Sequence, residues 1–202
     1  MDQVAPEAAM RATAANTDVE CSCVGLVPGA VYTARQLLDA LLMVSGNDAA
    51  NALADMVGGY RVAVQKMNFK AAQLGARNTR AGSPSGLDGP GWESVTTAHD
   101  LAVIYRAALN YPLFTQIIHQ STASFPDGRG GVKQIASHDD LLPDYPGFIG
   151  GKTGYTNLAK ETYVAMAQRG GTRLVAVMMY GSDDLWDQGR ALLDWGFSQS
   201  GQ

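Results

Sequence analysis

The stretch "GFIGGKTGYTNLAKETYVAMAQRGGTRLVAVMMYG", Gly147 to Gly181, combines β-strand composition with glycine-rich turns. Its apolar and β-branched runs predict three strands, over residues 147–154, 161–168 and 172–181. The short Arg169-Gly170-Gly171 segment joins the last two strands closely enough for antiparallel pairing. An antiparallel sheet is therefore expected at the C-terminal end of the chain.

Helical patterns precede and follow this sheet. The helix that opens in "YTARQLLDALLMV" has a capping box, Thr33 with Gln36, and an apolar stripe. Thr97 caps another helix, and Pro112 is expected to end it. The expected helices span residues 32–44, 48–57, 60–74, 96–110 and 183–197, with a hairpin formed by 121–125 and 131–137. Helices grouped ahead of an antiparallel sheet predict an α+β fold, and residues 1–202 are expected to form a single domain.

Composition narrows the possible functions. The chain has 202 residues, 46% of them hydrophobic and 17% charged, with a formal net charge of −4 and no basic cluster. Such a charge pattern argues against nucleic acid as a partner. There is no apolar run of about 18 residues, and the first residues lack the features of a signal peptide. The sequence therefore favours chemistry on small molecules or peptides, and we expect no cofactor.

The two cysteines, Cys21 and Cys23, are separated by one residue. In an extended segment their side chains would lie too far apart for an unstrained disulfide. We therefore expect two inert thiols, with a strained local disulfide or a metal contact as the alternatives.

Two common site types fit the sequence poorly. The "GKT" of Gly151 to Thr153 lacks a P-loop glycine, because Pro146 stands in its place, and a strand instead of a helix is expected to follow. The three histidines are scattered, so no metal site is expected. His138, followed by two aspartates, is interpreted as part of a polar loop, with cation binding as the alternative.

Two tripeptides together indicate a more specific chemistry. Ser45-x-Asn47 lies at a break between helices, and Lys152-Thr153-Gly154 lies on a strand about a hundred residues later. This is the S-x-N and K-T-G pattern of penicillin-recognising serine enzymes. A lysine and a threonine on a strand edge can hold a carboxylate, and glycine lets the substrate backbone approach closely. The alternatives are that Ser45 and Asn47 cap the helix beginning at Asp48 and that Lys152 is merely solvated.

Longer segments share this resemblance, among them "YTARQLLDALLMVSGNDAANALA", "VTTAHDLAVIYRAAL", "YPGFIGGKTGYTNLA" and "RALLDWGF". From about residue 2 to 197 the chain resembles the low-molecular-mass penicillin-binding D-alanyl-D-alanine carboxypeptidases, serine peptidases of the S11 type, with an actinobacterial character in "VECSCVGLVPG". The resemblance implies a central antiparallel sheet flanked by helices, with a helical lobe. It also implies a hydrolase that removes D-alanine from peptidoglycan pentapeptides ending in D-Ala-D-Ala, binds β-lactams and acts in the cell envelope or outside the cell.

Site residues follow from the same resemblance. Lys152, Thr153 and Gly154 would bind the substrate carboxylate, and the N–H of Tyr155 would be one oxyanion donor. Ser45 would relay a proton to the leaving amine, and Asn47 would bond a substrate amide. Arg190 corresponds to an arginine that some members use on the terminal carboxylate.

One part of the family pattern is missing from these residues. No serine precedes any lysine by three positions, so the S-x-x-K nucleophile and base are absent. The family places that motif upstream of the matching region, after a signal peptide and two strands. We therefore expect a truncated N-terminus, a late start site or a remnant, and no acylation of this polypeptide alone.

Two other functions remain open. A non-catalytic binder of D-alanyl peptides or penicillin could use the same residues without a nucleophile. A serine β-lactamase-like enzyme is less favoured, because no E-x-E-L-N-like segment lies between Asn47 and Lys152. Substrate preference is left open by Asp139-Asp140, where asparagine is frequent in relatives, and by Lys160-Glu161.

Overall fold

A computed structural model describes residues 3–141, 144–181 and 184–200. The chain contains two compact units. The first comprises Met1–Lys70, Ala81–Ser94 and Thr122–Ser137, and the second comprises Ala71–Arg80, Val95–Ser121 and His138–Gln202.

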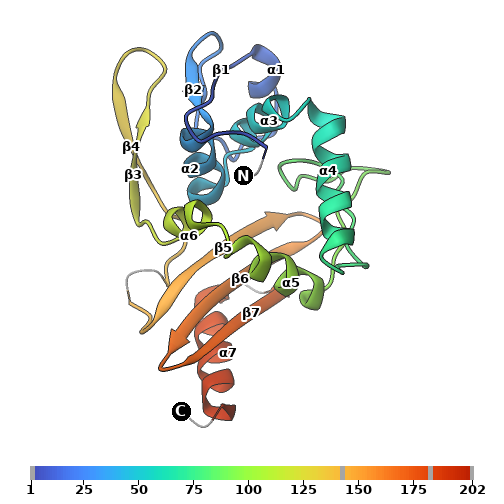
Figure 1. The fold of residues 1–202 in the computed structure, drawn as a ribbon, viewed down its shortest axis with the longest axis vertical. Helices are drawn as coiled ribbons and strands as arrows, with labels where there is room; N and C mark the ends of the chain where they lie inside the picture. The colour runs from blue at the N-terminus through green and yellow to red at the C-terminus, as the bar shows by residue number, and fades with distance from the viewer. Residues whose placement is uncertain (1–2, 142–143, 182–183, 201–202) are drawn as a thin grey trace. The chain divides into compact units, whose positions relative to one another are not determined.

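The second unit is built on a three-stranded antiparallel sheet. Its strands are β5 (Phe148–Thr156), β6 (Lys160–Arg169) and β7 (Thr172–Gly181), in the order β5-β6-β7. In Figure 1, α7 (Leu185–Gln199) packs on one face of the sheet and α5 (Ala98–Ala108) on the other. The short helix α6 (Pro112–Ile118) contacts β5.

The central strand β6 shows why this sheet needs helices on both faces. Tyr163, Ala165 and Ala167 belong to the core cluster that includes Leu193 and Phe197 of α7. The alternate residues of β6, Val164 and Met166, are also buried. A strand buried on both faces carries a continuous apolar run instead of polar alternation, and "TYVAMA" is such a run.

The first unit combines helices with two small antiparallel pairs. Strand β1 (Ala9–Arg11) pairs with β2 (Val31–Thr33), and β3 (Thr122–Pro126) pairs with β4 (Val132–Ala136). The helices are α1 (Ala14–Thr17), α2 (Ala34–Val44), α3 (Asn47–Met56) and α4 (Tyr60–Gln73), whose last three residues belong to the second unit.

Most of the predicted elements are present. The three C-terminal strands, the hairpin and the closing helix are confirmed, as are the Thr33 capping box and the Thr97 cap. The expectation for Pro112 was incomplete, because α5 has already ended at Ala108 and Pro112 begins a further helix, α6. Proline suits the first turn of a helix, where its missing N–H has no partner to lose.

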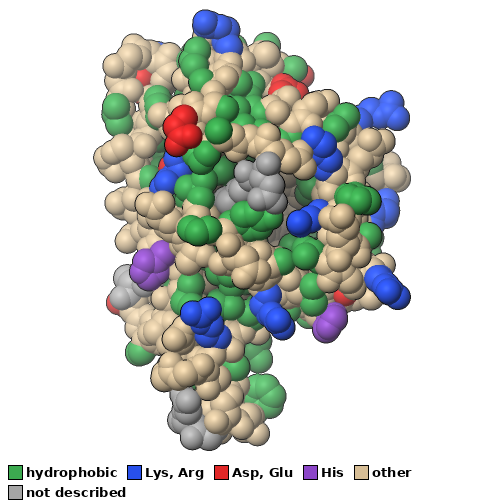
Figure 2. Space-filling view, in the orientation of Figure 1, with side chains coloured by type: hydrophobic (Ala, Val, Ile, Leu, Met, Phe, Trp, Pro, Cys, Tyr) green, Lys and Arg blue, Asp and Glu red, His purple; other side chains and the backbone are tan. Residues whose placement is uncertain are grey.

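The architecture is an α+β fold, as expected. None of the described helices is long and apolar enough to cross a membrane. The lysine and arginine side chains on the face drawn in Figure 2 stand apart from one another instead of forming one basic patch. The assignment of all 202 residues to one domain remains a prediction.

Candidate active site

The K-T-G tripeptide lies on the outer strand of its sheet. Lys152, Thr153 and Gly154 pair with Val164, Tyr163 and Thr162 of β6. Among the described strands, β6 is the only one that pairs with β5. An outer strand leaves backbone N–H and C=O groups available to an extended peptide.

The two glycines before the lysine allow close packing under β5. Gly150 has φ of +150°, and a Cβ there would lie 2.6 Å from the carbonyl oxygen of Ile118. A Cβ on Gly151 would lie 2.4 Å from Oδ2 of Asp139 and 2.8 Å from the ring of Tyr163. Glycine is therefore required by sterics at both positions, because real Cβ atoms do not approach other atoms so closely.

A buried carboxylate, Asp139, lies beneath this part of the strand. It is 6% exposed, and it accepts hydrogen bonds from the Tyr163 hydroxyl at 3.0 and 3.2 Å and from the N–H of Leu141 at 3.1 Å. Burial raises the pKa of Asp139 to about 6, although both donors oppose the shift. Burial and the negative charge of Asp139 also raise the pKa of Tyr163.

Lys152 is half-buried, and its electrostatic surroundings are unusual for a lysine. Burial lowers its pKa to about 8, and the nearby charge of Asp139 partly counteracts that effect. Its ammonium group donates to the carbonyl oxygen of Thr153. Burial and the charge of Lys152 lower the pKa of His138. The lysine is thus held in a poorly hydrated position, where an added anion would be stabilised strongly.

Helix α5 is tied to the same strand by a tyrosine. The hydroxyl of Tyr105, itself buried, donates to the carbonyl oxygen of Gly150 at 2.7 Å. This bond lies where the β5–β6 register shifts, between Phe148 and Gly150. Sequence reasoning did not identify Tyr105 or Tyr163, because each sits within an apolar helix or strand pattern that predicts only packing.

Ser45 and Asn47 lie together at the junction of α2 and α3. Ser45 follows α2 in the left-handed conformation, with φ of 54°, and Gly46 is the N-cap of α3 without a side-chain hydrogen bond. Asn47 is the first residue of α3 and is 7% exposed. The alternative that Ser45 and Asn47 cap this helix is therefore wrong.

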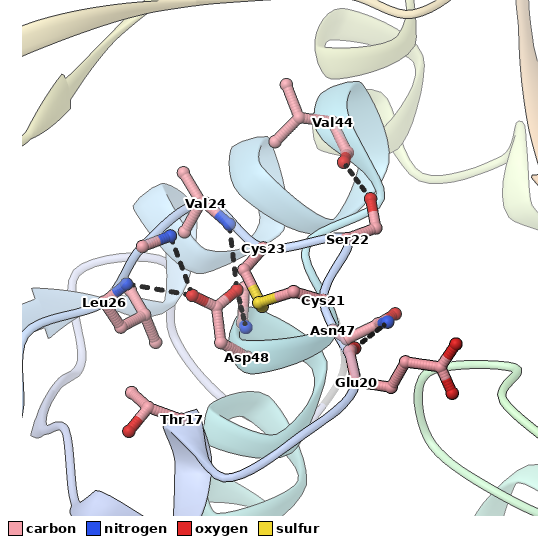
Figure 3. The surroundings of a disulfide bond; sticks show 12 residues. Thr17, Glu20, Cys21, Ser22, Cys23, Val24, Leu26, Val44, Asn47 and Asp48 are labelled. Atoms are coloured by element: carbon pink, nitrogen blue, oxygen red, sulfur yellow. Dashed lines mark hydrogen bonds between the residues drawn. A yellow bond between two sulfur atoms is a disulfide. The ribbon is translucent and has the colours of Figure 1, made fainter.

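The two cysteines lie in the segment that contacts Asn47. The expectation of free thiols was wrong. Cys21 and Cys23 form a disulfide, with their Cα atoms 4.9 Å apart. The chain bends at Cys21 instead of running as a strand, so the two residues are closer than the roughly 6.6 Å that an extended segment would give. Figure 3 shows this disulfide beside Asn47 and Asp48.

The remaining predicted residues can also be placed. Tyr155 lies on β5, with an exposed side chain, in register with Glu161. Arg190 lies on α7, with its guanidinium 5.6 Å from the centroid of the Tyr145 ring. In the part of the chain that the structure describes, no group of three or more His, Cys, Asp or Glu residues is arranged to hold a metal ion.

The predicted site residues thus form two groups and one separate residue. Lys152, Thr153, Gly154 and Tyr155 are neighbours on β5 in the second unit, and Arg190 is placed elsewhere in that unit, against Tyr145. Ser45 and Asn47 form the other group, in the first unit.

Comparison with known proteins identifies the family. The model of the S11 peptidase family, described as D-alanyl-D-alanine carboxypeptidase, matches residues 3–183. The D-alanyl-D-alanine carboxypeptidase DacB2 of Mycobacterium tuberculosis is 54% identical over 207 residues, covering 100% of this chain and 71% of that protein. DacF of Bacillus subtilis is 33% identical, covering 86% of this chain and 45% of its own length.

Solved structures agree with the sequence comparison. The crystal structure of a D-alanyl-D-alanine carboxypeptidase from Mycobacterium tuberculosis has a TM-score of 0.94 at 55% identity and covers 98% of this chain and 76% of that one. A variant of the Streptomyces K15 DD-transpeptidase has a TM-score of 0.88 at 27% identity, covering 98% and 82%. The protein belongs to the S11 family of serine-type D-alanyl-D-alanine carboxypeptidases.

Proposed function

We propose that this protein takes part in the removal of the terminal D-alanine from peptidoglycan stem peptides through an acyl-enzyme, in the cell envelope or outside the cell. The observation that carries the proposal is the position of Lys152, Thr153 and Gly154 on the outer strand β5. A peptide that lies along this strand can use its backbone groups, and its C-terminal carboxylate can reach an ammonium and a hydroxyl.

Electrostatics favour a carboxylate ligand at this strand. The pKa of Lys152 is about 8 because the ammonium is poorly hydrated. An incoming carboxylate stabilises the charged form, so we expect substrate binding to raise this pKa. A β-lactam carries a comparable carboxylate and should compete for the same position.

The other roles come from the family pattern. Ser45 would pass a proton to the leaving amine, and Asn47 would bond a substrate amide. The N–H of Tyr155 would be one of the donors to the oxyanion, and loss of such a donor costs about 10²–10³ in rate. Arg190 would contribute to carboxylate recognition in the wider site.

A binding experiment tests the role of Lys152. Calorimetry with a peptide ending in D-Ala-D-Ala should show binding that Lys152→Ala weakens about 10- to 100-fold, because hydrogen bonds to charged groups contribute about 1.5–3 kcal/mol. Lys70→Ala, which removes an exposed lysine of α4, should bind normally. The same peptide with an amidated C-terminus should bind as weakly to the original chain as the acid does to Lys152→Ala. Equal binding of acid and amide would contradict carboxylate recognition.

A labelling experiment tests acylation. The 202 residues contain no S-x-x-K pair, so we propose that this polypeptide alone does not become acylated. A fluorescent penicillin should leave no label that survives denaturation, while the longer protein with an S-x-x-K region in frame should be labelled. Covalent labelling of the 202-residue chain would show that a different nucleophile acts.

A non-catalytic binder of D-alanyl peptides is the second candidate. This polypeptide contains the Lys152 group and the Asn47 group of site residues, but its 202 residues contain no S-x-x-K pair. That combination favours a non-catalytic binder. It predicts reversible binding of peptide or penicillin and no D-alanine release, even when the upstream coding sequence is supplied.

A further inference from the structure

The disulfide-bonded segment makes two direct hydrogen bonds to Asn47. The backbone N–H of Asn47 donates to the carbonyl oxygen of Ser22, and its Nδ2 donates to the carbonyl oxygen of Glu20, both at 2.7 Å. These two acceptors come from the residues on either side of Cys21. We propose that the Cys21–Cys23 disulfide is a positioning element for Asn47, fixing the two carbonyl groups that set the orientation of its side-chain amide.

The hydrogen bond to Glu20 determines the orientation of the Asn47 side-chain amide. A carbonyl oxygen can only accept, so the atom facing it must be the NH₂ group. Among the described residues, no donor reaches Oδ1 of Asn47. The carbonyl oxygen of Asn47 and the second N–H of its amide group therefore remain for a peptide group of the substrate. This part of the inference rests on the proposed function.

The segment is also fixed within the disulfide loop and directly after it. The Ser22 hydroxyl donates to the carbonyl oxygen of Val44 at 3.2 Å. On the far side, Asp48, which is 1% exposed, accepts the N–H groups of Val24, Gly25 and Leu26 at 2.9–3.0 Å. Residues 20–26 are thus bound to the end of α2 and the start of α3.

The disulfide acts on the part of the segment that these bonds leave least defined. Asp48 holds residues 24–26, whereas the carbonyl groups of Glu20 and Ser22 depend on the backbone around Cys21. A covalent link across Ser22 removes backbone conformations in which those carbonyls would turn away from Asn47. Without the link, the entropy cost of ordering these residues would have to be offset by the two hydrogen bonds to Asn47 and the bond from Ser22 to Val44.

Reduction provides a direct test on the intact chain. Dithiothreitol transfers two electrons and two protons to the Cys21–Cys23 bond, giving two thiols, and is itself oxidised to its cyclic disulfide. Nuclear magnetic resonance of the ¹⁵N-labelled chain, without any ligand, then reports the side-chain NH₂ and the backbone N–H of Asn47. We expect both groups to exchange with solvent at least about tenfold faster after reduction, and we expect the same for Cys21→Ser/Cys23→Ser.

The N–H groups of Val24 and Leu26 serve as internal references, because Asp48 holds them independently of the disulfide. Their protection should change less than that of Asn47. If Asn47 stays protected after reduction, the proposal is wrong. It is equally wrong if the variant unfolds or if protection is lost equally at Val24, Leu26 and Asn47, because the disulfide then supports the whole unit.

A matched variant separates positioning from general stability. Thr33→Ala removes the cap at the opposite end of α2 and should lower the melting temperature without changing Asn47 exchange. Where peptide binding is measurable, reduction should weaken it, whereas Thr33→Ala should not. Because the exchange measurement needs no ligand, its outcome stands even if D-alanyl peptides prove not to bind.

Discussion

Gly151 precedes the lysine of β5 and packs against the carboxylate of Asp139. A methyl group at this position would lie 2.4 Å from Oδ2 of Asp139 and 2.9 Å from the hydroxyl of Tyr163. Gly151→Ala should therefore force the buried pair apart and lower the free energy of unfolding by about 1–3 kcal/mol. Urea denaturation measures the change. Gly171→Ala is the matched control, because its Cβ would meet no atom within 4 Å, and equal losses in the two variants would contradict this account.

The pKa of Asp139 gives the stability a characteristic pH dependence. Burial raises this pKa from 3.8 to about 6, so between these values the folded chain keeps a proton that the unfolded chain releases. The contribution of Asp139 to the free energy of unfolding therefore falls as pH rises through this window, by about 2–3 kcal/mol in total. The charged or titratable groups around it are Lys152, Tyr163, Tyr105 and Asp140.

Asp139→Asn isolates this contribution. The stability of the variant relative to the original chain should increase between pH 4 and pH 7, as measured by denaturation at each pH. Asp144→Asn, at an exposed position outside the groups that act on Asp139, should keep the original pH profile. A relative stability of Asp139→Asn that does not change with pH would show that the carboxylate is not buried as described.

The sequence predicted the residues that carry local motifs and overlooked those whose role depends on distant contacts. Lys152, Thr153 and Gly154 are adjacent in sequence, so their pattern was readable directly. The contact of Asp139 with Tyr163 joins residues 24 positions apart, and no periodicity indicates such a pair. Asp139 was noticed only as part of the polar loop after His138 and as a departure from asparagine in relatives.

At the scale of elements, Tyr105 connects α5 to β5. Its hydroxyl is the donor at 2.7 Å to the carbonyl oxygen of Gly150, in a buried position. Tyr105→Phe should leave this acceptor unpaired and cost about 1–3 kcal/mol of unfolding free energy. The control is Tyr145→Phe, whose hydroxyl bonds to the half-exposed Asp194 at 2.8 Å, where water can replace it. An equal loss of unfolding free energy in both variants would show that burial of the α5–β5 hydrogen bond does not determine its contribution to stability.

Element boundaries were predictable where the residues themselves impose them. Thr33 and Thr97 cap helices because each side chain accepts the backbone N–H three residues ahead. The helix beginning at Pro112 was missed because proline can end one helix or start another, and only packing decides which. The disulfide was expected only as an alternative to free thiols, because extended geometry was assumed for a segment that bends at Cys21.

At the scale of the whole molecule, the order of the elements predicted the fold class, and the resemblance of motifs and longer segments indicated the family. The S-x-N and K-T-G motifs, in this order along the chain, indicated penicillin-recognising serine enzymes. No sequence motif indicated the contacts that hold each group of site residues in place. Their support consists of a disulfide-bonded segment at Asn47 and a buried carboxylate at Gly151, and both depend on contacts between segments far apart in sequence.

The outer strand β7 leads to a prediction about association. In the described sheet, β7 pairs only with β6, so one of its edges offers unpaired backbone groups, and Met179 on this strand is 37% exposed. Such an edge pairs readily with a second copy of the chain. We expect concentration-dependent self-association, measured by light scattering after size exclusion. Met179→Lys should weaken it by about tenfold or more, because association would bring like charges together.

Met67→Lys provides the control for this experiment. Met67 lies on α4 and is 40% exposed, so its replacement changes surface apolarity and net charge by nearly the same amount without touching a sheet edge. Self-association that responds equally to both variants would indicate general hydrophobic attraction. A response confined to Met179→Lys would locate the contact at β7, because strand pairing requires the edge itself to be approached.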